Sequence, residues 1–301
     1  MANLHLLFIF NSDSMRSFLS HILVFATILT CLLIIIFAAG SYISQHRQRM
    51  NGTYVWGDSQ MYQGLDIFTL SSQIHSSVFS SAQHGSGVYD FLVSLECMPP
   101  HSTCIIAFSE CALYRNPQAD ANRTGMSPTA LWTMIKYGCP LKDCIRIVGL
   151  NHNKLLYKPF STSNSLYGYS PEIIYSEPLT AFCNMFNEKK DFAIWKRNVF
   201  MRGLRELDEK GCRLILIQFP FYQEVEECAE GSYNRHLTEN LKKEIIERYH
   251  FDIHTMKIES DSLLMHDLSH LNEVGAKLIT KHVAKEIKAS TKKNIFLKFD
   301  I

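Results

Sequence analysis

The sequence predicts an α/β protein in which helices cover both faces of a central parallel sheet, a three-layer α/β/α arrangement, preceded by one transmembrane helix. Two observations predict this class. Short and almost wholly apolar runs, such as 104–108 and 213–220, alternate with longer segments of helical periodicity. Buried parallel strands joined by helices have this pattern. Near the N-terminus, an uncharged and mostly apolar stretch exceeds the roughly twenty residues that a helix needs to span a bilayer.

The uncharged stretch sets the domain organisation. No Lys, Arg, Asp or Glu lies between Arg16 and Arg47. A cleaved signal peptide is the competing interpretation, but the apolar run is longer than a usual signal segment. Met15 is an alternative start, which would make the residues before it a mis-assigned extension. We expect a tail at 1–17, a transmembrane anchor at 18–42, a linker at 43–52 and one α/β domain at 53–301.

The first half of the domain begins with the apolar, β-prone run 53–56, and the helix-permissive segment 60–65 follows it. Residues 74–80 are predicted to form the second strand. Apolar residues at helical spacing predict a helix over 88–98, and the pair Pro99–Pro100 ends it.

Beyond that helix, 104–108 has the fully apolar composition of a buried parallel strand. A helix over 127–137 follows, with Ser127 as its cap and Pro128 at its first position. Residues 151–188 are irregular and rich in Ser, Asn, Tyr and Pro. So long an unpatterned insertion in a compact domain is typical of a functional loop.

The last third contains the clearest strand of the chain, 213–220. A helix over 191–211 precedes it and ends at a glycine. The pattern then predicts a helix over 239–249, a short strand over 251–256 and a final helix over 273–287.

Composition limits the classes of function that are compatible with the chain. The 301 residues carry a formal net charge of +1, so there is no general case for nucleic-acid binding. Nine cysteines include no CxxC pair, which makes a zinc site a poor interpretation. Local disulfides between Cys139 and Cys144, or between Cys97 and Cys104, are one possibility, and buried free thiols are the other.

A tight turn follows the first predicted strand, with the sequence Gly57-Asp58-Ser59. A serine on a strand-to-helix turn exposes its hydroxyl group, and its own N–H lies at the positive end of the helix. That geometry suits a nucleophile which also helps to bind an oxyanion. The alternative is that Ser59 only caps the helix. We expect Asp58 to be structural and to accept hydrogen bonds from nearby amides.

A second polar constellation precedes the last helix, where Asp267 and His270 are three residues apart. Such a carboxylate can fix the imidazole tautomer, so that the other ring nitrogen faces a serine. In parallel sheets the functional site lies at the carboxyl ends of the strands, where this loop and Ser59 both belong. A metal site at His266, Asp267 and His270 is an alternative, although no Glu follows His266 as in the HExxH pattern.

These two blocks resemble the SGNH (GDSL-like) hydrolases and acyltransferases. In that family Gly-Asp-Ser ends the first strand and Asp-x-x-His precedes the final helix. The resemblance covers roughly residues 53 to 288 at the level of fold and is specific at the two ends. It implies an SGNH, flavodoxin-like sheet and a catalytic triad of Ser59, Asp267 and His270, with no cofactor and no metal.

The resemblance also implies an oxyanion hole made by the backbone of Ser59 and of a glycine after the second strand. Gly85 is the best positional match, with a plain turn glycine as the alternative. The family's third block, Gly-x-Asn-Asp, is missing after 104–108. Tyr114, Arg115 and Asn116 are candidates to replace its oxyanion donor, and a solvated loop is the alternative for all three.

The missing block makes the chain similar to a divergent, membrane-anchored branch, the alginate O-acetylation and teichoic-acid D-alanyl transfer proteins. This similarity implies a serine esterase or O-acyltransferase acting on acyl esters, above all acetyl esters, of a cell-envelope polysaccharide. The expected partners are the acylated glycan or another ester substrate, the membrane and a multispanning acyltransferase, with no nucleic acid. The alternative is a catalytically inactive SGNH-derived binding or accessory module for a membrane acyltransferase.

The sequence allows two interpretations of the membrane orientation. Arg16 precedes the anchor, and Arg47 and Arg49 follow it, which by the positive-inside rule favours a cytoplasmic domain. The charge difference is small, however, and family members with one N-terminal anchor work outside the membrane. We therefore expect a single-pass protein with an extracytoplasmic catalytic domain.

Overall fold

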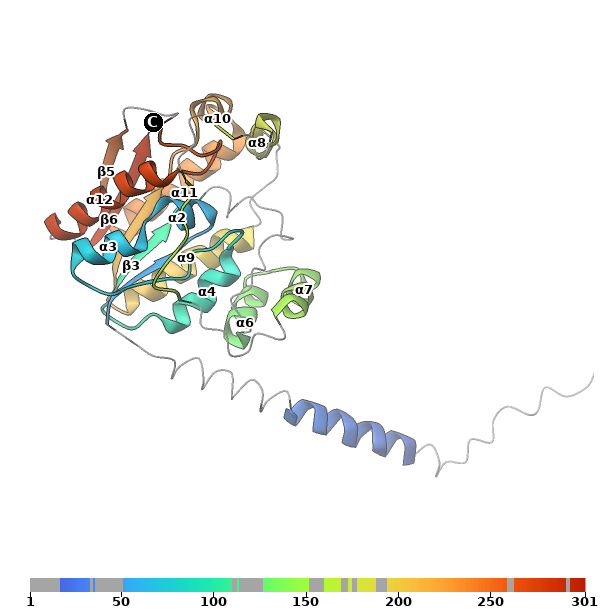
Figure 1. Ribbon diagram of the computed structural model, residues 1–301. Coiled ribbons are helices and arrows are strands. Elements are labelled where there is room, and N and C mark those ends of the chain that lie inside the picture. The colour runs from blue at the N-terminus through green and yellow to red at the C-terminus, as the bar shows by residue number, and fades with distance from the viewer. Residues whose placement is uncertain are drawn as a thin grey trace, which may run out of the picture.

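The centre of the protein is a six-stranded sheet in which every pair of neighbouring strands is parallel. The computed structural model describes residues 17–32, 35, 51–109, 113, 127–151, 160–168, 173–174, 178–187, 194–258, 263–290 and 293–300. The order across the sheet is β2-β1-β3-β4-β6-β5 (Figure 1). The strands are β1 (Thr53–Trp56), β2 (Val78–Ser80), β3 (Thr103–Ala107), β4 (Arg213–Gln218), β5 (Asp252–Lys257) and β6 (Asn294–Asp300).

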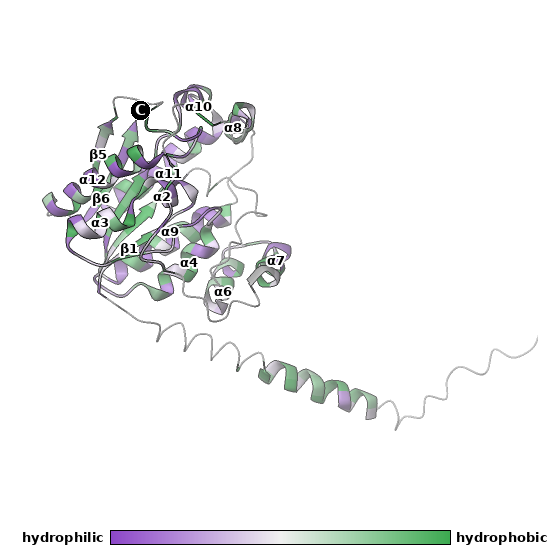
Figure 2. Cartoon of the chain, viewed as in Figure 1, coloured by the Kyte–Doolittle hydropathy of each residue, from purple (hydrophilic) through white to green (hydrophobic). Residues whose placement is uncertain are grey.

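Helices connect these strands and cover both faces, which confirms the α/β class. Their bounds are α2 (Ser59–Gly64), α3 (Ile67–Ile74), α4 (Val88–Cys97), α6 (Pro128–Lys136), α7 (Leu141–Asn151), α8 (Leu179–Asn187), α9 (Ile194–Glu209), α10 (Gln223–Ala229), α11 (Tyr233–Tyr249) and α12 (Glu273–Ala289). Figure 2 shows the hydrophobic residues concentrated on the strands and on the helix faces that meet them.

The two faces of the sheet are built by strict alternation of side chains along each strand. On β1, Tyr54 and Trp56 belong to one apolar cluster, with side chains of α4, α9 and α11. Val55 belongs to the opposite cluster, with side chains of α2, α3 and α12. Successive residues of a strand point to opposite faces, so strands covered on both sides must be apolar throughout.

The chain order places a switch point beside β1. From β1 the chain passes to β2 on one side and then returns to β3 on the other side. The connections also change face, because α3 packs in one apolar cluster and α4 in the other. Ligands of open parallel sheets bind outside the carboxyl ends of the strands at such a point. The turn containing Ser59 lies there, directly after β1.

Most predicted elements are confirmed within a few residues, and the exceptions have local causes. The second strand begins only at Val78, because α3 extends to Ile74 and His75 ends it in the left-handed conformation, with φ of 52°. The helix predicted from residue 239 begins at Tyr233, where Ser232 caps it. The final strand β6 was not predicted, although it inserts between β4 and β5.

Near the N-terminus, residues 17–32 are helical and exposed, and Figure 2 shows this helix as mostly hydrophobic. Within the ranges that the structure describes, no helix is both long enough and apolar enough to cross a membrane. The predicted transmembrane helix over 18–42 is therefore not confirmed. Much of that segment, and most of the linker 43–52, lies outside the described residues.

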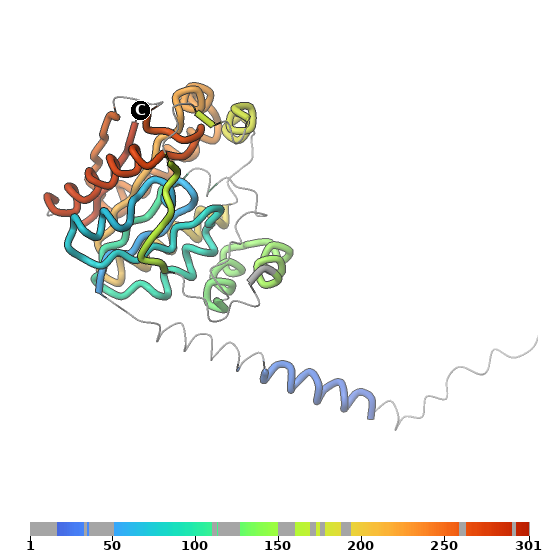
Figure 3. The backbone as a smooth tube through the Cα atoms, in the orientation of Figure 1, coloured from blue at the N-terminus to red at the C-terminus, as the bar shows by residue number. Residues whose placement is uncertain are grey.

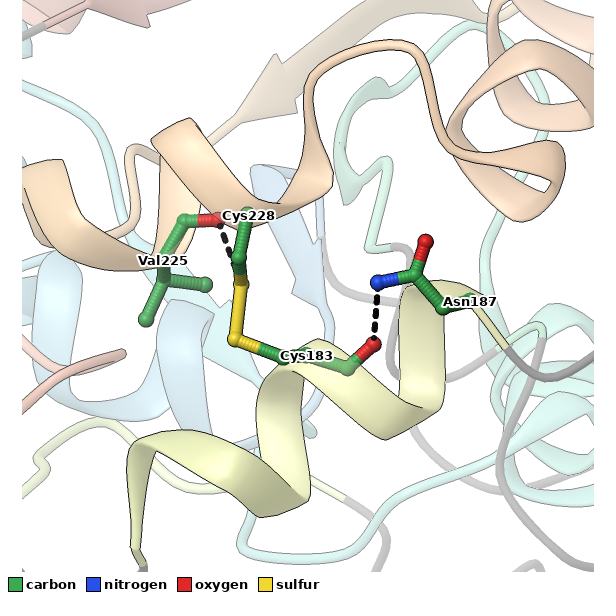
Figure 4. The surroundings of a disulfide bond; sticks show 4 residues. All are labelled: Cys183, Asn187, Val225 and Cys228. Carbon is green, nitrogen blue, oxygen red and sulfur yellow. Dashed lines mark hydrogen bonds between the residues drawn. A yellow bond between two sulfur atoms is a disulfide. The ribbon is translucent and has the colours of Figure 1, made fainter.

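A disulfide joins Cys183 of α8 to Cys228 of α10 (Figure 4). Of the two possibilities for the other cysteines, the structure shows buried thiols without local disulfides, at Cys97, Cys104, Cys139 and Cys144. Spacing along the chain cannot find a pair that is 45 residues apart. The two bonded helices share a third apolar cluster, which also contains Leu268, the neighbour of Asp267.

Candidate active site

Ser59 is the first residue of α2 and is half-buried in the turn that leaves β1. Asp58 caps the helix, and its Oδ1 accepts a hydrogen bond from the Gln60 N–H at 3.1 Å, as predicted for a structural carboxylate. The turn requires glycine at 57, because a Cβ there would lie 2.3 Å from Met61 Cβ and 2.8 Å from Ala107 Cβ. The backbone of β1 can therefore approach β3 closely just before Ser59.

His270 and Asp267 form a close pair in the loop between β5 and α12. His270 Nδ1 lies 2.9 Å from Asp267 Oδ1 and 2.8 Å from Oδ2, so this nitrogen carries the proton that it donates to the carboxylate. In the neutral ring Nε2 is then an acceptor. His270 Nε2 is buried and has no hydrogen-bond partner among the described residues. The pair thus presents an unused basic nitrogen.

The electrostatics of Asp267 keep it ionised. Burial alone would raise its pKa, but the hydrogen bond from His270 and those from the Ser269 and His270 amides, both 2.8 Å long, more than compensate. Together they lower the pKa of Asp267 to about 2. A carboxylate held in this way orients the imidazole and stabilises its protonated form.

The loop that contains this pair is fixed by its own backbone. The His266 N–H donates to the His270 carbonyl at 2.8 Å, and the Asn272 N–H donates to the Leu264 carbonyl at 2.9 Å. Asn272 also caps α12, because its Oδ1 accepts from the amides of Val274 and Gly275 at 2.9 and 3.1 Å. These hydrogen bonds fix the orientation of the Asp267–His270 loop, which is more than two hundred residues from β1 in sequence.

Gln60 connects the two blocks, and the sequence did not point to it. Its buried side chain donates from Nε2 to the Ser269 carbonyl at 3.2 Å. Gln60, which follows Ser59, thus contacts Ser269, which precedes His270. No hydrogen bond joins Ser59 Oγ to His270 Nε2 in this structure. Such bonds are often long in ligand-free enzymes and shorten when substrate binds.

The loop after β2 lies beside the same turn. The Ser81 N–H donates to the Val55 carbonyl at 2.8 Å, and the Gln83 N–H donates to the Gly57 carbonyl at 3.2 Å. Gly85 follows with φ of 71°, a conformation that favours glycine. Neither the Ser59 N–H nor the Gly85 N–H has an acceptor within the described part of the chain. Both donors are therefore unused.

Two aromatic rings near His270, those of His84 and Tyr167, were not singled out from the sequence. The His84 and Tyr167 rings lie 6.3 and 5.7 Å from the His270 ring, between centroids, and Tyr167 stacks on His266 at 4.1 Å. Burial raises the pKa of Tyr167, and the Asp267 charge adds to this effect, so its phenol stays neutral.

Tyr167 lies in the stretch 151–188, which the sequence predicted to be an irregular, functional loop. The structure differs at the end of this stretch, where α8 is helical. Asn164 holds the segment near Tyr167, because its Nδ2 donates to the carbonyls of Tyr62 and Leu65 at 2.6 and 2.8 Å. Ser161 pairs with Ser80 at the end of β2. Figure 3 shows the segment 160–168 crossing the chain near α2.

After β3, where the sequence has no Gly-x-Asn-Asp block, Ser109 contacts the serine turn. Its Oγ donates to Asp58 Oδ2 at 2.5 Å and so ties the end of β3 to the serine turn. The suggested oxyanion donors Tyr114, Arg115 and Asn116 lie outside the described residues.

The geometry does not favour the alternative metal site at His266, Asp267 and His270. Asp267 accepts from His270 and from backbone amides, and the His266 ring stacks on Tyr167. In the described ranges no group of three or more His, Cys, Asp or Glu side chains is arranged to hold a metal ion.

Comparison with known proteins adds no identification: no protein-family model matches the chain, and no curated protein matches it in sequence.

Proposed function

We propose that this chain is a membrane-anchored serine esterase or O-acyltransferase of the SGNH type, with the flavodoxin-like sheet of that superfamily. It acts on acyl esters, above all acetyl esters, of a cell-envelope polysaccharide. The observation that supports this most is the His270–Asp267 pair, whose unpartnered Nε2 belongs to the loop that Gln60 ties to the serine turn. A histidine oriented by a buried carboxylate beside a serine is the arrangement of an activated nucleophile.

The chemistry follows from these positions. Ser59 Oγ attacks the ester carbonyl carbon while His270 Nε2 takes the hydroxyl proton. The C–O bond to the alcohol then breaks, and His270 returns the proton to the leaving oxygen, which leaves an acyl group on Ser59. Water or a sugar hydroxyl attacks this acyl-enzyme in the same way and regenerates the serine. Hydrolysis and transfer differ only in the acceptor.

The negative charge that develops on the carbonyl oxygen is stabilised by backbone N–H groups that have no other acceptor before the reaction. The Ser59 N–H at the start of α2 and the Gly85 N–H in the loop after β2 meet that condition among the described residues. Loss of one oxyanion donor typically costs a few kcal/mol of transition-state stabilisation. We assign the hole to these two amides.

Two features support a membrane-anchored protein with an extracytoplasmic domain. The uncharged segment between Arg16 and Arg47 supports a single membrane anchor. The Cys183–Cys228 disulfide supports an oxidising, extracytoplasmic environment for the domain, since cytosolic proteins are kept reduced. A multispanning acyltransferase that supplies the acyl group is the expected partner.

The test is covalent labelling of the full chain in detergent with a fluorophosphonate probe, followed by intact mass and peptide mapping. We expect one adduct on Ser59 in the wild type and none in Ser59→Ala. His270→Ala should label roughly a hundred-fold more slowly or worse, because a general base contributes about that much. Ser72→Ala removes an exposed serine of α3 and should label like the wild type.

A folded wild type that takes no label would overturn the esterase proposal. The alternative, an SGNH-derived binding or accessory module, would then be favoured. The missing Ser59–His270 hydrogen bond is the observation consistent with that alternative. Labelling of Ser59→Ala at the wild-type rate would place the reactive group elsewhere.

A further inference from the structure

A cavity of about 320 Å³ opens between α9 and α11, among the helices that cover the face of the sheet opposite α2 and α12. It shares no residue with the candidate active site. Its lining comes from one face of α9, from the last two turns of α11 and from the residue after α6: Tyr137, Arg197, Asn198, Met201, Arg202, Arg205, Glu244, Arg248 and Tyr249.

The lining is strongly basic. Four arginines and one glutamate give it three net positive charges, in a chain whose overall formal charge is +1. The nearby Asp208 does not reduce this excess, because it pairs with Lys293 at 2.5 Å. Like charges repel, so such a cluster in a concave site favours an anion.

Glu244 holds two of the guanidinium groups in place. It forms ion pairs with Arg197 and, at 3.1 Å, with Arg248. Both arginines are thereby oriented by a carboxylate that they share, which leaves each with unused N–H donors.

The other two arginines are held less closely by carboxylates. Arg202, half-buried, has no hydrogen-bond or ion-pair partner among the described residues. Arg205 contacts Glu209 at 3.9 Å, beyond hydrogen-bond distance. Both side chains line the cavity.

We propose that this cavity binds a phosphate group. Planar guanidinium groups bind phosphate oxygens in pairs, and four arginines line this cavity. A carboxylate brings one negative charge, whereas a phosphate monoester brings about −1.5 to −2 and balances the excess better. The volume lies at the lower end of ligand sites, which suits a small anionic group. A lipid headgroup and a soluble phosphate compound share this chemistry.

Calorimetric titration of the full chain in zwitterionic detergent tests the proposal. One arm adds inorganic pyrophosphate, and the other adds phosphatidic acid in mixed micelles, with phosphatidylcholine as the uncharged reference. We expect saturable binding in at least one arm. Binding to pyrophosphate indicates a soluble phosphate, and binding to phosphatidic acid alone indicates a lipid headgroup.

The variant Arg202→Ala/Arg205→Ala should bind roughly ten-fold more weakly or worse, because it removes two charged donors. Lys281→Ala/Lys285→Ala removes the same charge from exposed positions of α12 and should bind like the wild type. If the alanine variant is not folded, Arg202→Gln/Arg205→Gln replaces it. Absence of saturable binding in both arms, or equal binding by the arginine variant, would overturn the proposal. Ser59 labelling is expected to be unaffected by any of these changes.

Discussion

Replacing both Cys183 and Cys228 by alanine removes the disulfide that joins α8 to α10. The bond closes a loop with a sequence separation of 45. By the loop-entropy relation, a cross-link of that span stabilises the folded chain by about 4 kcal/mol, because it restricts the unfolded chain. Both cysteines are half-buried, so their truncation leaves little cavity and the loop term dominates.

The assay is urea unfolding of the full chain, followed by far-UV circular dichroism with and without dithiothreitol. Reductant should lower the unfolding free energy of the wild type to that of the double variant, which itself should not respond. The matched control is Cys139→Ala/Cys144→Ala, which removes two buried free thiols and should keep its response to reductant.

The reasoning would be refuted by a wild type that is equally stable with and without reductant. A response that is lost in the Cys139→Ala/Cys144→Ala control would instead assign the disulfide to that pair. In either case the apolar cluster of α8 and α10 would hold these helices without a covalent bond.

Two further predictions concern the candidate site. The pKa of Asp267 is lowered to about 2 in the folded protein. Ionised Asp267 therefore stabilises the fold at pH values above the ordinary carboxyl pKa near 4, and this stabilisation is lost as the pH falls toward 2. Asp267→Asn should abolish roughly 2 kcal/mol of this acid-sensitive stability, measured by unfolding between pH 5 and pH 2, and an unchanged pH profile would contradict the assignment. Gly57→Ala should destabilise the fold by about 1–3 kcal/mol in urea and slow the labelling of Ser59, because the new Cβ would meet Met61 and Ala107; wild-type behaviour would show that the turn has room.

Several parts of the fold were predictable because their signals are local. The runs that became β3 and β4 are apolar throughout, as strands covered on both faces must be. The cap of α6 was predictable from Ser127 and Pro128, whose side chain and ring act within one turn. The three-residue spacing of Asp267 and His270 predicted a carboxylate–imidazole pair, and the structure shows their hydrogen bond.

Other features depend on contacts between distant segments. Gln60 has no distinguishing neighbours in sequence, yet it donates to a carbonyl 209 positions away. Tyr167 lies in an unpatterned insertion, and its place beside His266 and His270 is supported by the side chain of Asn164, which donates to the backbone carbonyls of Tyr62 and Leu65. Strand β6 follows the last helix and becomes a central strand only because β4 and β5 leave a place between them.

The sequence by itself determined the class of the fold, the serine turn and the spacing of Asp267 and His270, because periodicity, turn chemistry and short-range spacing are properties of neighbouring residues. Only the tertiary structure decided that Gln60 joins the two blocks, that Cys183 bonds Cys228 and that four arginines line one cavity. The physical reason is that these contacts depend on how the chain closes long loops around a common sheet, and no local pattern encodes which distant residues then become neighbours.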